Sequence, residues 1–210
     1  MNYNELYVLN TAIDGEDIYS LQKFSSKRMS LAAVEIVKDI LIEKGFLEDY
    51  NTLTTKGLLE VRKIKQFKDA KKYAEVLNMV IGFIDEKEAV LLTADRNGDY
   101  LFAIIDPGKN VETLIDTFPE LLQHIDAAAE SQYENDTCMS SRDLLGEYKI
   151  NIQTSFTITT VDIKDGEKST KELFFESGGK RFYYDCANNL LHERNRDQLV
   201  SLLRKRMEVV

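Results

Sequence analysis

Residues 80–105 constrain the fold of this chain more than any other stretch. Three short runs in it are rich in β-branched and aromatic residues and are separated by two polar turns. The runs span residues 80–84, 89–94 and 100–105. Such runs, bounded by Asp, Asn and Gly, are typical of antiparallel strands joined by hairpins. Asn97-Gly98 is the strongest turn signal, because both residues tolerate the positive φ that tight hairpins require.

A helix is predicted directly after the third run. Asp106-Pro107-Gly108 ends the strand, because proline has no N–H to donate to a ladder. Apolar residues then recur at helical spacing. They are Val111, Leu114, Ile115, Phe118, Leu121 and Leu122. Residues 80–122 are therefore predicted to form a three-stranded antiparallel meander closed by a helix.

The same order of elements is predicted again in residues 148–210. Three strand-like runs separated by Gly-containing turns span residues 156–163, 173–175 and 182–184. An amphipathic helix follows, with Leu199, Val200, Leu202, Leu203 and Met207. Two copies favour a pseudo-symmetric fold rather than a solenoid, and chance recurrence of a common motif is the alternative. Residues 123–147 are predicted to connect the halves, with a helical extension over 127–129 and a loop over 135–138.

The N-terminal part of the chain, residues 1–79, is predicted to be mainly helical. A short helix spans residues 4–10. Ser30 is a suitable N-cap for a second helix that ends near Lys44, because its hydroxyl can accept a hydrogen bond from a free N–H of the first turn. Gly45 follows as the C-cap, where a left-handed backbone conformation is common.

A β-ribbon and a long helix complete this part. Residues 46–47 and 52–54 are predicted to pair across a turn, and a helix then runs from about Thr55 to Met79. Helix, ribbon and helix in this order are the outline of a winged helix. The whole chain is therefore predicted to be α+β: an antiparallel sheet built from two quasi-symmetric meander-plus-helix halves, with a winged-helix-like N-terminal segment. We expect one compact domain made of four segments: 1–79, 80–122, 123–147 and 148–210.

Charge argues against nucleic-acid binding. The chain carries 27 Lys and Arg and 36 Asp and Glu, a net charge of −9, and an acidic chain repels phosphates. The helix after Ser30 carries three acidic residues, and Glu48 and Asp49 lie in the ribbon turn where a DNA-binding wing would be basic. Asp69 and Glu75 interleave with the basic residues of 62–72, as on a solvated helix face. We interpret the winged-helix outline as a packing unit; a winged-helix transcription regulator with a ligand-sensing meander domain is the alternative.

The sequence contains no motif that would indicate an enzyme. The GxSxG, HExxH, P-loop and GxGxxG patterns do not occur. His124 and His192 have no nearby His or Cys at metal-ligand spacing. Cys138 and Cys186 are far apart and form no CxxC pair. We therefore expect no catalytic residues, no cofactor and no metal.

A cytosolic protein is expected. No apolar run approaches the roughly 18–20 residues that a membrane span needs. The first five residues lack the basic and apolar regions of a signal peptide. Two isolated cysteines also agree with a reducing compartment.

The residues around the predicted ribbon carry a resemblance to a known family. A helix ends in Leu-Ile-Glu-Lys-Gly-Phe-Leu at 41–47, an acidic turn follows, and Leu53-Thr54 to Gly57 begin the next helix. A meander and the run 117–122, Thr-Phe-Pro-Glu-Leu-Leu, come after it. This order resembles the EspG-like cytosolic chaperones of type VII (ESX) secretion, above all the Firmicute accessory proteins encoded beside type VII toxins. That family has two quasi-symmetric halves; the charge-rich hairpin tips here depart from its mycobacterial pattern.

The resemblance implies a non-enzymatic chaperone or adaptor in the cytosol of a Gram-positive cell. Such a protein binds a helical secretion substrate, a toxin or a WXG-type protein, and keeps it soluble for export. An apolar groove with a polar rim can bind a helix in this way. Leu199, Leu203 and Met207 of the C-terminal helix are expected to form part of that surface. Packing of these residues against the chain's own sheet is the alternative.

Overall fold

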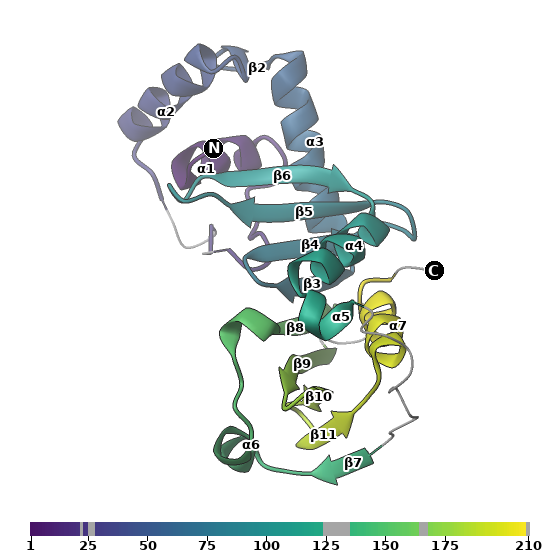
Figure 1. Ribbon diagram of the computed structural model, residues 1–210. Coiled ribbons are helices and arrows are strands. Elements are labelled where there is room, and N and C mark those ends of the chain that lie inside the picture. The colour runs from purple at the N-terminus through teal and green to yellow at the C-terminus, as the bar shows by residue number, and fades with distance from the viewer. Residues whose placement is uncertain (22, 25–27, 124–134, 164–167, 209–210) are drawn as a thin grey trace. The chain divides into compact units, whose positions relative to one another are not determined.

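A computed structural model describes residues 1–21, 23–24, 28–123, 135–163 and 168–208 (Figure 1). It confirms the predicted α+β class, with helices and antiparallel strands in both parts of the chain. The chain divides into two compact units. The N-terminal unit comprises Met1–Ala70, Met79–Ile84 and Ala89–Ile104, and the C-terminal unit comprises Lys71–Asn78, Asp85–Glu88 and Ile105–Val210. None of the helices in the described residues combines the length and apolar character needed to span a membrane.

The N-terminal unit begins with three helices and a hairpin (Figure 1). The helices are α1 (Tyr3–Thr11), α2 (Leu31–Glu43) and α3 (Thr55–Asp69). The predicted ribbon is confirmed, because β1 (Leu47–Asp49) and β2 (Thr52–Leu53) pair antiparallel between α2 and α3. The cap predicted at Ser30 is also confirmed, since the Ser30 hydroxyl accepts a hydrogen bond from the Ala33 N–H at 3.3 Å.

The long helix predicted to reach Met79 is wrong in its second half. α3 ends at Asp69, and the backbone of Ala70 is already extended, with φ −63° and ψ 137°. Residues Lys72–Val76 form strand β3 instead. Tyr73, Ala74 and Val76 are buried there, and this burial outweighs the helical preference of the lysines around them.

The first meander has the predicted strands. They are β4 (Met79–Phe83), β5 (Ala89–Ala94) and β6 (Tyr100–Ile105), in the order β6-β5-β4. Gly98 has φ +80°, as the turn signal Asn97-Gly98 requires. Helix α3 packs on this meander, where the rings of Phe67 and Phe102 meet edge to face with their centroids 5.6 Å apart.

The C-terminal unit contains more strands than the sequence predicts. Its order is β3-β8-β9-β10-β11-β7, and every register given between neighbours is antiparallel. The predicted strands are β8 (Ser155–Asp162), β9 (Lys168–Ser177) and β10 (Lys180–Asp185). Strand β11 (Leu190–Glu193) was not predicted, and β7 (Asn135–Cys138) lies where a loop was expected. The loop prediction failed because β7 is short and polar and takes its strand geometry from pairing with β11.

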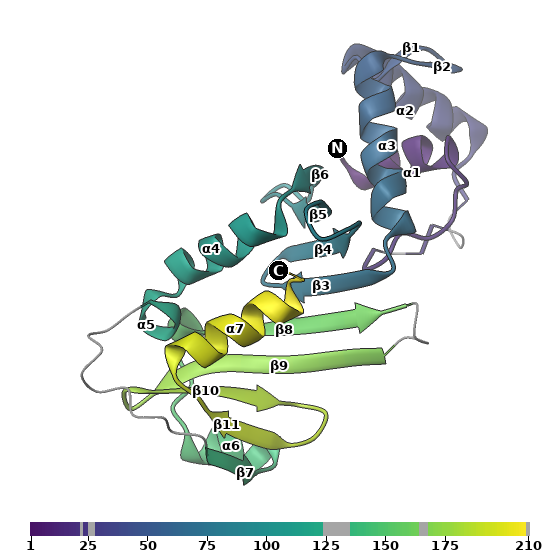
Figure 2. The same cartoon turned by 90° about the vertical axis from the view of Figure 1, so that its right-hand side faces the viewer.

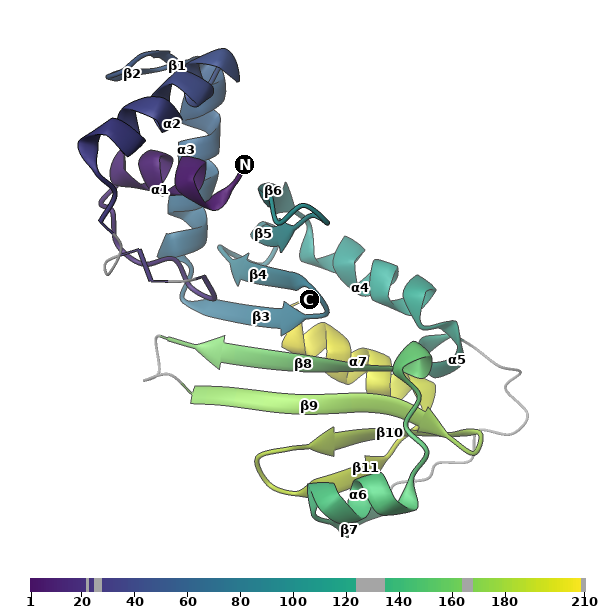
Figure 3. The same ribbon diagram turned by 90° about the vertical axis from the view of Figure 1, so that its left-hand side faces the viewer.

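Helices cover both faces of this sheet (Figures 2 and 3). Helix α7 (Arg196–Arg206) lies on one face, together with α4 (Pro107–Thr117) and α5 (Pro119–Leu122). Helix α6 (Ser141–Glu147) lies on the other face, and a 3-10 turn, η1 (Ile152–Thr154), leads into β8. The predicted helical extension over 127–129, the turn at 164–167 and His124 lie outside the described residues.

Candidate protein-binding surface

The residues predicted to contact a partner lie in the interior of the C-terminal unit. Leu199, Leu203 and Met207 each have 0% of their surface exposed. Helix α7 packs on α4, α5 and β10. A side chain without exposed surface cannot touch a partner unless the unit rearranges. The three residues are therefore core residues in this structure, which is the alternative that the sequence left open.

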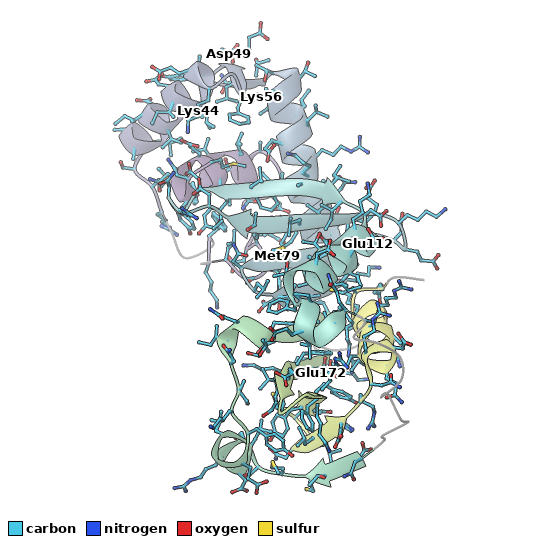
Figure 4. The ribbon with its side chains drawn as sticks, in the orientation of Figure 1. Lys44, Asp49, Lys56, Met79, Glu112 and Glu172 are labelled. Atoms are coloured by element: carbon cyan, nitrogen blue, oxygen red, sulfur yellow. The ribbon has the colours of Figure 1, made fainter. Side chains whose placement is uncertain are left out.

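The basic end of α7 also serves the fold. Arg206 donates two hydrogen bonds to the carboxylate of Glu172, from Nε at 2.8 Å and from Nη2 at 2.5 Å. Glu172, labelled in Figure 4, is buried on β9. The hydrogen bonds to Glu172 raise the pKa of Arg206 above its usual value. Arg206 thus fastens the end of α7 to the sheet.

Helix α2, in the N-terminal unit, leaves two large apolar side chains exposed. Only Val37 and Leu41 are buried. Leu31 is 84% exposed and Ile36 is 62% exposed. A surface helix of a monomer normally turns its large apolar residues inward, and exposed apolar surface marks a site of interaction.

Acidic residues share the exposed side of α2 with these two apolar side chains. Glu35, Asp39 and Glu43 recur every four residues, so they form one stripe along the exposed side of the helix. Leu31 lies four residues before Glu35, at the N-terminal end of this stripe, and Ile36 lies beside it. The stripe and these two apolar residues make up what we call the α2 surface. Residues 31–54 carry five acidic and two basic residues, a net charge of 2 − 5 = −3.

The β1–β2 hairpin is fastened to α2 at its turn. The Tyr50 hydroxyl donates a hydrogen bond to Asp39 Oδ1 at 2.6 Å. Lys38 Nζ donates to the Tyr50 carbonyl oxygen at 2.8 Å. The hydrogen bond to Asp39 raises the pKa of the Tyr50 phenol. The hairpin therefore bends back along the helix and borders the α2 surface.

An open pocket of about 410 Å³ lies between the end of α1, helix α2 and the hairpin. We call it the hairpin pocket. Its lining consists of Val8, Leu9, Thr11, Ala12, Lys38, Leu47, Tyr50, Asn51 and Leu53. The buried side chains among these, Val8, Leu9 and Leu47, are apolar. Four lining residues are polar: Thr11, Lys38, Tyr50 and Asn51. Lys38 and Tyr50 form the hydrogen bonds of the hairpin turn, and the Thr11 hydroxyl donates to the Val8 carbonyl oxygen at 2.6 Å.

The cations near the hairpin are used inside the unit (Figure 4). Lys44 Nζ lies 2.7 Å from Oε1 of the buried Glu5, which caps α1. Lys56 Nζ donates to the Lys44 carbonyl oxygen at 2.7 Å and lies 4.2 Å from the centroid of the Phe46 ring. Both lysines stay exposed, and the hairpin itself carries Glu48 and Asp49.

Two lysines of the basic run on α3 are likewise engaged. Lys63 Nζ lies 2.5 Å from Glu60 and donates to the Phe102 carbonyl oxygen at 2.8 Å. Lys68 is nearly buried and pairs with Asp14. This part of the run serves the interior of the unit and is unavailable to a nucleic-acid backbone.

A glycine fixes the junction of α2, hairpin and α3. A Cβ at Gly57 would lie 2.0 Å from the Phe46 carbonyl oxygen, so no side chain fits there. The Thr54 hydroxyl donates to the Gly45 carbonyl oxygen at 2.7 Å and accepts from the Gly57 N–H at 3.1 Å. The residues that carry the family resemblance, at 41–57, are those that build this junction.

A second polar cluster lies on β10, β11 and β7 of the C-terminal unit. Asp136 Oδ1 lies 2.8 Å from His192 Nδ1 and 2.7 Å from Arg194 Nη2. The Tyr183 ring stacks on the His192 imidazole, with centroids 4.2 Å apart. The hydrogen bond from His192 and the contact with Arg194 hold the pKa of Asp136 below its usual value. Sequence reasoning missed this cluster because the segment with Asp136 was predicted to be a loop.

The cluster fastens an edge strand and does not assemble a metal site. The His192 imidazole is hydrogen-bonded to Asp136. Among the described residues, no group of three or more His, Cys, Asp and Glu side chains is placed to hold a metal ion. Cys138 and Cys186 are free thiols, and burial raises the pKa of Cys186.

Comparison with known proteins identifies the family of the chain. No curated protein matches the sequence. A family model described as domain of unknown function (DUF5081) matches residues 1–209. Since this match covers nearly the whole length, the chain belongs to the DUF5081 family.

Proposed function

We propose that this chain is a non-enzymatic cytosolic chaperone or adaptor that binds a helical substrate of a type VII secretion system and keeps it soluble for export. The observation that carries the proposal is the α2 surface, where Leu31 and Ile36 are exposed on a well-formed helix. A helix of a partner can cover such residues in the way that amphipathic helices dock on apolar surfaces. Their exposure in the free chain is a reason to expect a partner.

The resemblance to EspG-like chaperones supports the same proposal. The resemblance rests on residues 41–47 and 53–57, on the meander and on residues 117–122. The first two segments lie where α2 passes into the hairpin and where the hairpin passes into α3. Gly57 is required there by the close approach of the Phe46 carbonyl. The resembling residues therefore position the α2 surface, and one of them, Glu43, belongs to its acidic stripe.

The alternative is a winged-helix transcription regulator, and the helix–hairpin–helix order favours it. The exposed side of α2, the helix that would read DNA, carries Glu35, Asp39 and Glu43. These carboxylates would face phosphates, which costs affinity rather than adding to it. Charge therefore favours a protein partner.

Binding to a purified substrate tests the proposal. The full chain is mixed with WXG-type and toxin-derived helical proteins encoded beside its gene, and complexes are measured by light scattering after gel filtration. We expect a stoichiometric complex that Leu31→Asp and Ile36→Asp weaken at least tenfold. Leu145→Asp is the matched control, because Leu145 is a 71% exposed leucine on α6 of the other unit.

Two outcomes would overturn the proposal. One is that none of the helical substrates binds the wild-type chain. The other is salt-dependent binding of duplex DNA with an affinity tighter than micromolar, which would assign the N-terminal unit to regulation.

A further inference from the structure

The shape and charge of the α2 surface specify the chemistry of its partner. Resting on the proposed function, we infer that the α2 surface and the hairpin pocket together recognise a basic amphipathic helix. One large apolar side chain of that helix enters the hairpin pocket. Lys or Arg residues beside it pair with the acidic stripe of α2.

The pocket is suited to an apolar anchor. Its buried lining is made by Val8, Leu9 and Leu47. The Lys38 ammonium and the Tyr50 hydroxyl at its border already form hydrogen bonds to the Tyr50 carbonyl and to Asp39. A Leu, Met or Phe side chain can contact the apolar lining and leave these hydrogen bonds in place. Anchors of this kind, buried in a preformed pocket, contribute most of the affinity at many interfaces.

The acidic stripe is suited to a basic partner. Glu35, Asp39 and Glu43 are about 6 Å apart along the axis, at 1.5 Å per residue. Lys or Arg residues placed every four positions on a partner helix have the same spacing. Among the described residues, no cation forms an ion pair with Glu35 or Glu43. Their charge is therefore available to steer and orient a cationic helix.

The same charge argues against other occupants. A second copy of this chain would bring an identical acidic stripe against the first, and like charges at an interface are unfavourable. Duplex DNA would be repelled for the same reason. A basic helix is the occupant that the charges and the pocket favour together.

Peptide binding tests the inference. The probe is a stapled helical peptide of about 20 residues with a leucine ridge flanked by Lys and Arg; its partner probe carries Glu at every basic position. Fluorescence anisotropy is measured at low and high salt. We expect the basic peptide to bind the full chain at least tenfold more tightly than the acidic one. High salt should reduce this difference in affinity, because it screens the charges.

Variants of the chain test the contributions of the acidic stripe and of the hairpin pocket separately. Glu35→Lys with Glu43→Lys is expected to reverse the preference between the two peptides, and Glu112→Lys on α4, an exposed glutamate of the other unit, is expected to leave it unchanged. Ala12→Trp is expected to fill the pocket and weaken binding at least tenfold, because Ala12 is an exposed residue of its lining. Ala187→Trp, at an exposed turn of the other unit, is the control for the added ring.

The peptide experiments can fail independently of the test of the proposed function. Equal binding of the two peptides, or charge reversal without effect, would overturn the inference even if a secretion substrate still forms a complex. If Ala12→Trp binds the basic peptide as tightly as the wild type does, the hairpin pocket takes no part in recognition. Absence of any complex with secretion substrates would instead overturn the proposed function.

Discussion

Helices α2 and α7 use their apolar residues in opposite ways. Nine of the 13 residues of α2 are Leu, Ile, Val or Ala, yet only two of its residues, Val37 and Leu41, are buried. Four of the 11 residues of α7 are Leu or Val, and three of those are buried. The more apolar helix is thus the more exposed one. Apolar content alone does not identify a binding surface; what identifies it is apolar area that the fold leaves uncovered.

The packing around each helix explains the difference. Helix α7 has one narrow apolar stripe, and the C-terminal unit covers it with α4, α5 and β10. Helix α2 has apolar residues around most of its circumference, and α1 and β1 cover one side of it. The remaining side carries Leu31 and Ile36, which the described residues of the N-terminal unit leave exposed.

We predict that Leu203 contributes far more to the stability of the fold than Leu31 does. Leu203→Ala removes a fully buried side chain and leaves a cavity, so we expect a loss of about 2–5 kcal/mol in the free energy of unfolding. Leu31→Ala changes an exposed residue and is expected to cost less than about 0.5 kcal/mol. Urea unfolding followed by circular dichroism measures both. Equal losses would mean that Leu31 is covered in the free protein.

A second substitution tests whether the α2 surface is held by the junction beneath it. Gly57→Ala places a methyl group 2.0 Å from the Phe46 carbonyl oxygen, so the hairpin or α3 has to move. We expect a loss of about 1–3 kcal/mol, measured as a lower melting temperature. Gly146→Ala on α6 is the matched control, because its added methyl meets no atom within 4 Å. Replacing this helical glycine should stabilise that variant by about 0.5–1 kcal/mol. A higher melting temperature in both variants would contradict the clash at Gly57.

Local signals in the sequence predicted much of the fold. Turn residues and β-branched runs located β4, β5 and β6 to within one residue, because hairpin turns depend on the residues in them. The cap at Ser30 and the hairpin after α2 were also predictable. Strands β3, β7 and β11 were not, because each is short, β7 is polar, and β3 directly follows a lysine-rich helix. Their geometry comes from partners distant in the sequence, which periodicity does not report.

The candidate surface was only partly visible in the sequence. The acidic residues of α2 were noticed as an argument against DNA binding, but periodicity could not show that Leu31 and Ile36 remain uncovered. The contact between Tyr50 and Asp39 spans 11 positions and depends on the fold of the hairpin. On α7, the apolar spacing of Leu199 and Leu203 is the same for a core stripe as for a binding stripe. Only burial separates the two.

The smallest predicted effect is a pH-dependent change in stability, which we expect for Asp136 of the C-terminal unit and not for Glu43 of the N-terminal unit. Asp136 is paired with His192 and Arg194, which lower its pKa in the folded chain, whereas Glu43 on α2 is exposed. A carboxyl with a lowered folded pKa stabilises the fold above its unfolded pKa of about 3.9, and the stabilisation is lost as the pH falls through the folded pKa. Asp136→Asn should therefore be less stable than the wild type at pH 7 and equal to it well below pH 3. Since the Asp136 side chain is 54% exposed, solvent screening limits the difference to less than about 1 kcal/mol.

Glu43→Gln is the control for this pH dependence. It removes a carboxylate that no described cation pairs with, so its stability should follow that of the wild type at every pH from 2 to 7. Urea midpoints measured across that range compare the three proteins. A difference between Asp136→Asn and the wild type that stays constant with pH would mean that the ionised carboxylate is not what fastens β7. A pH-dependent loss in Glu43→Gln would mean that the acidic stripe of α2 is paired in the free chain, and the contrast between a carboxylate committed to the fold and carboxylates available to a partner would fail.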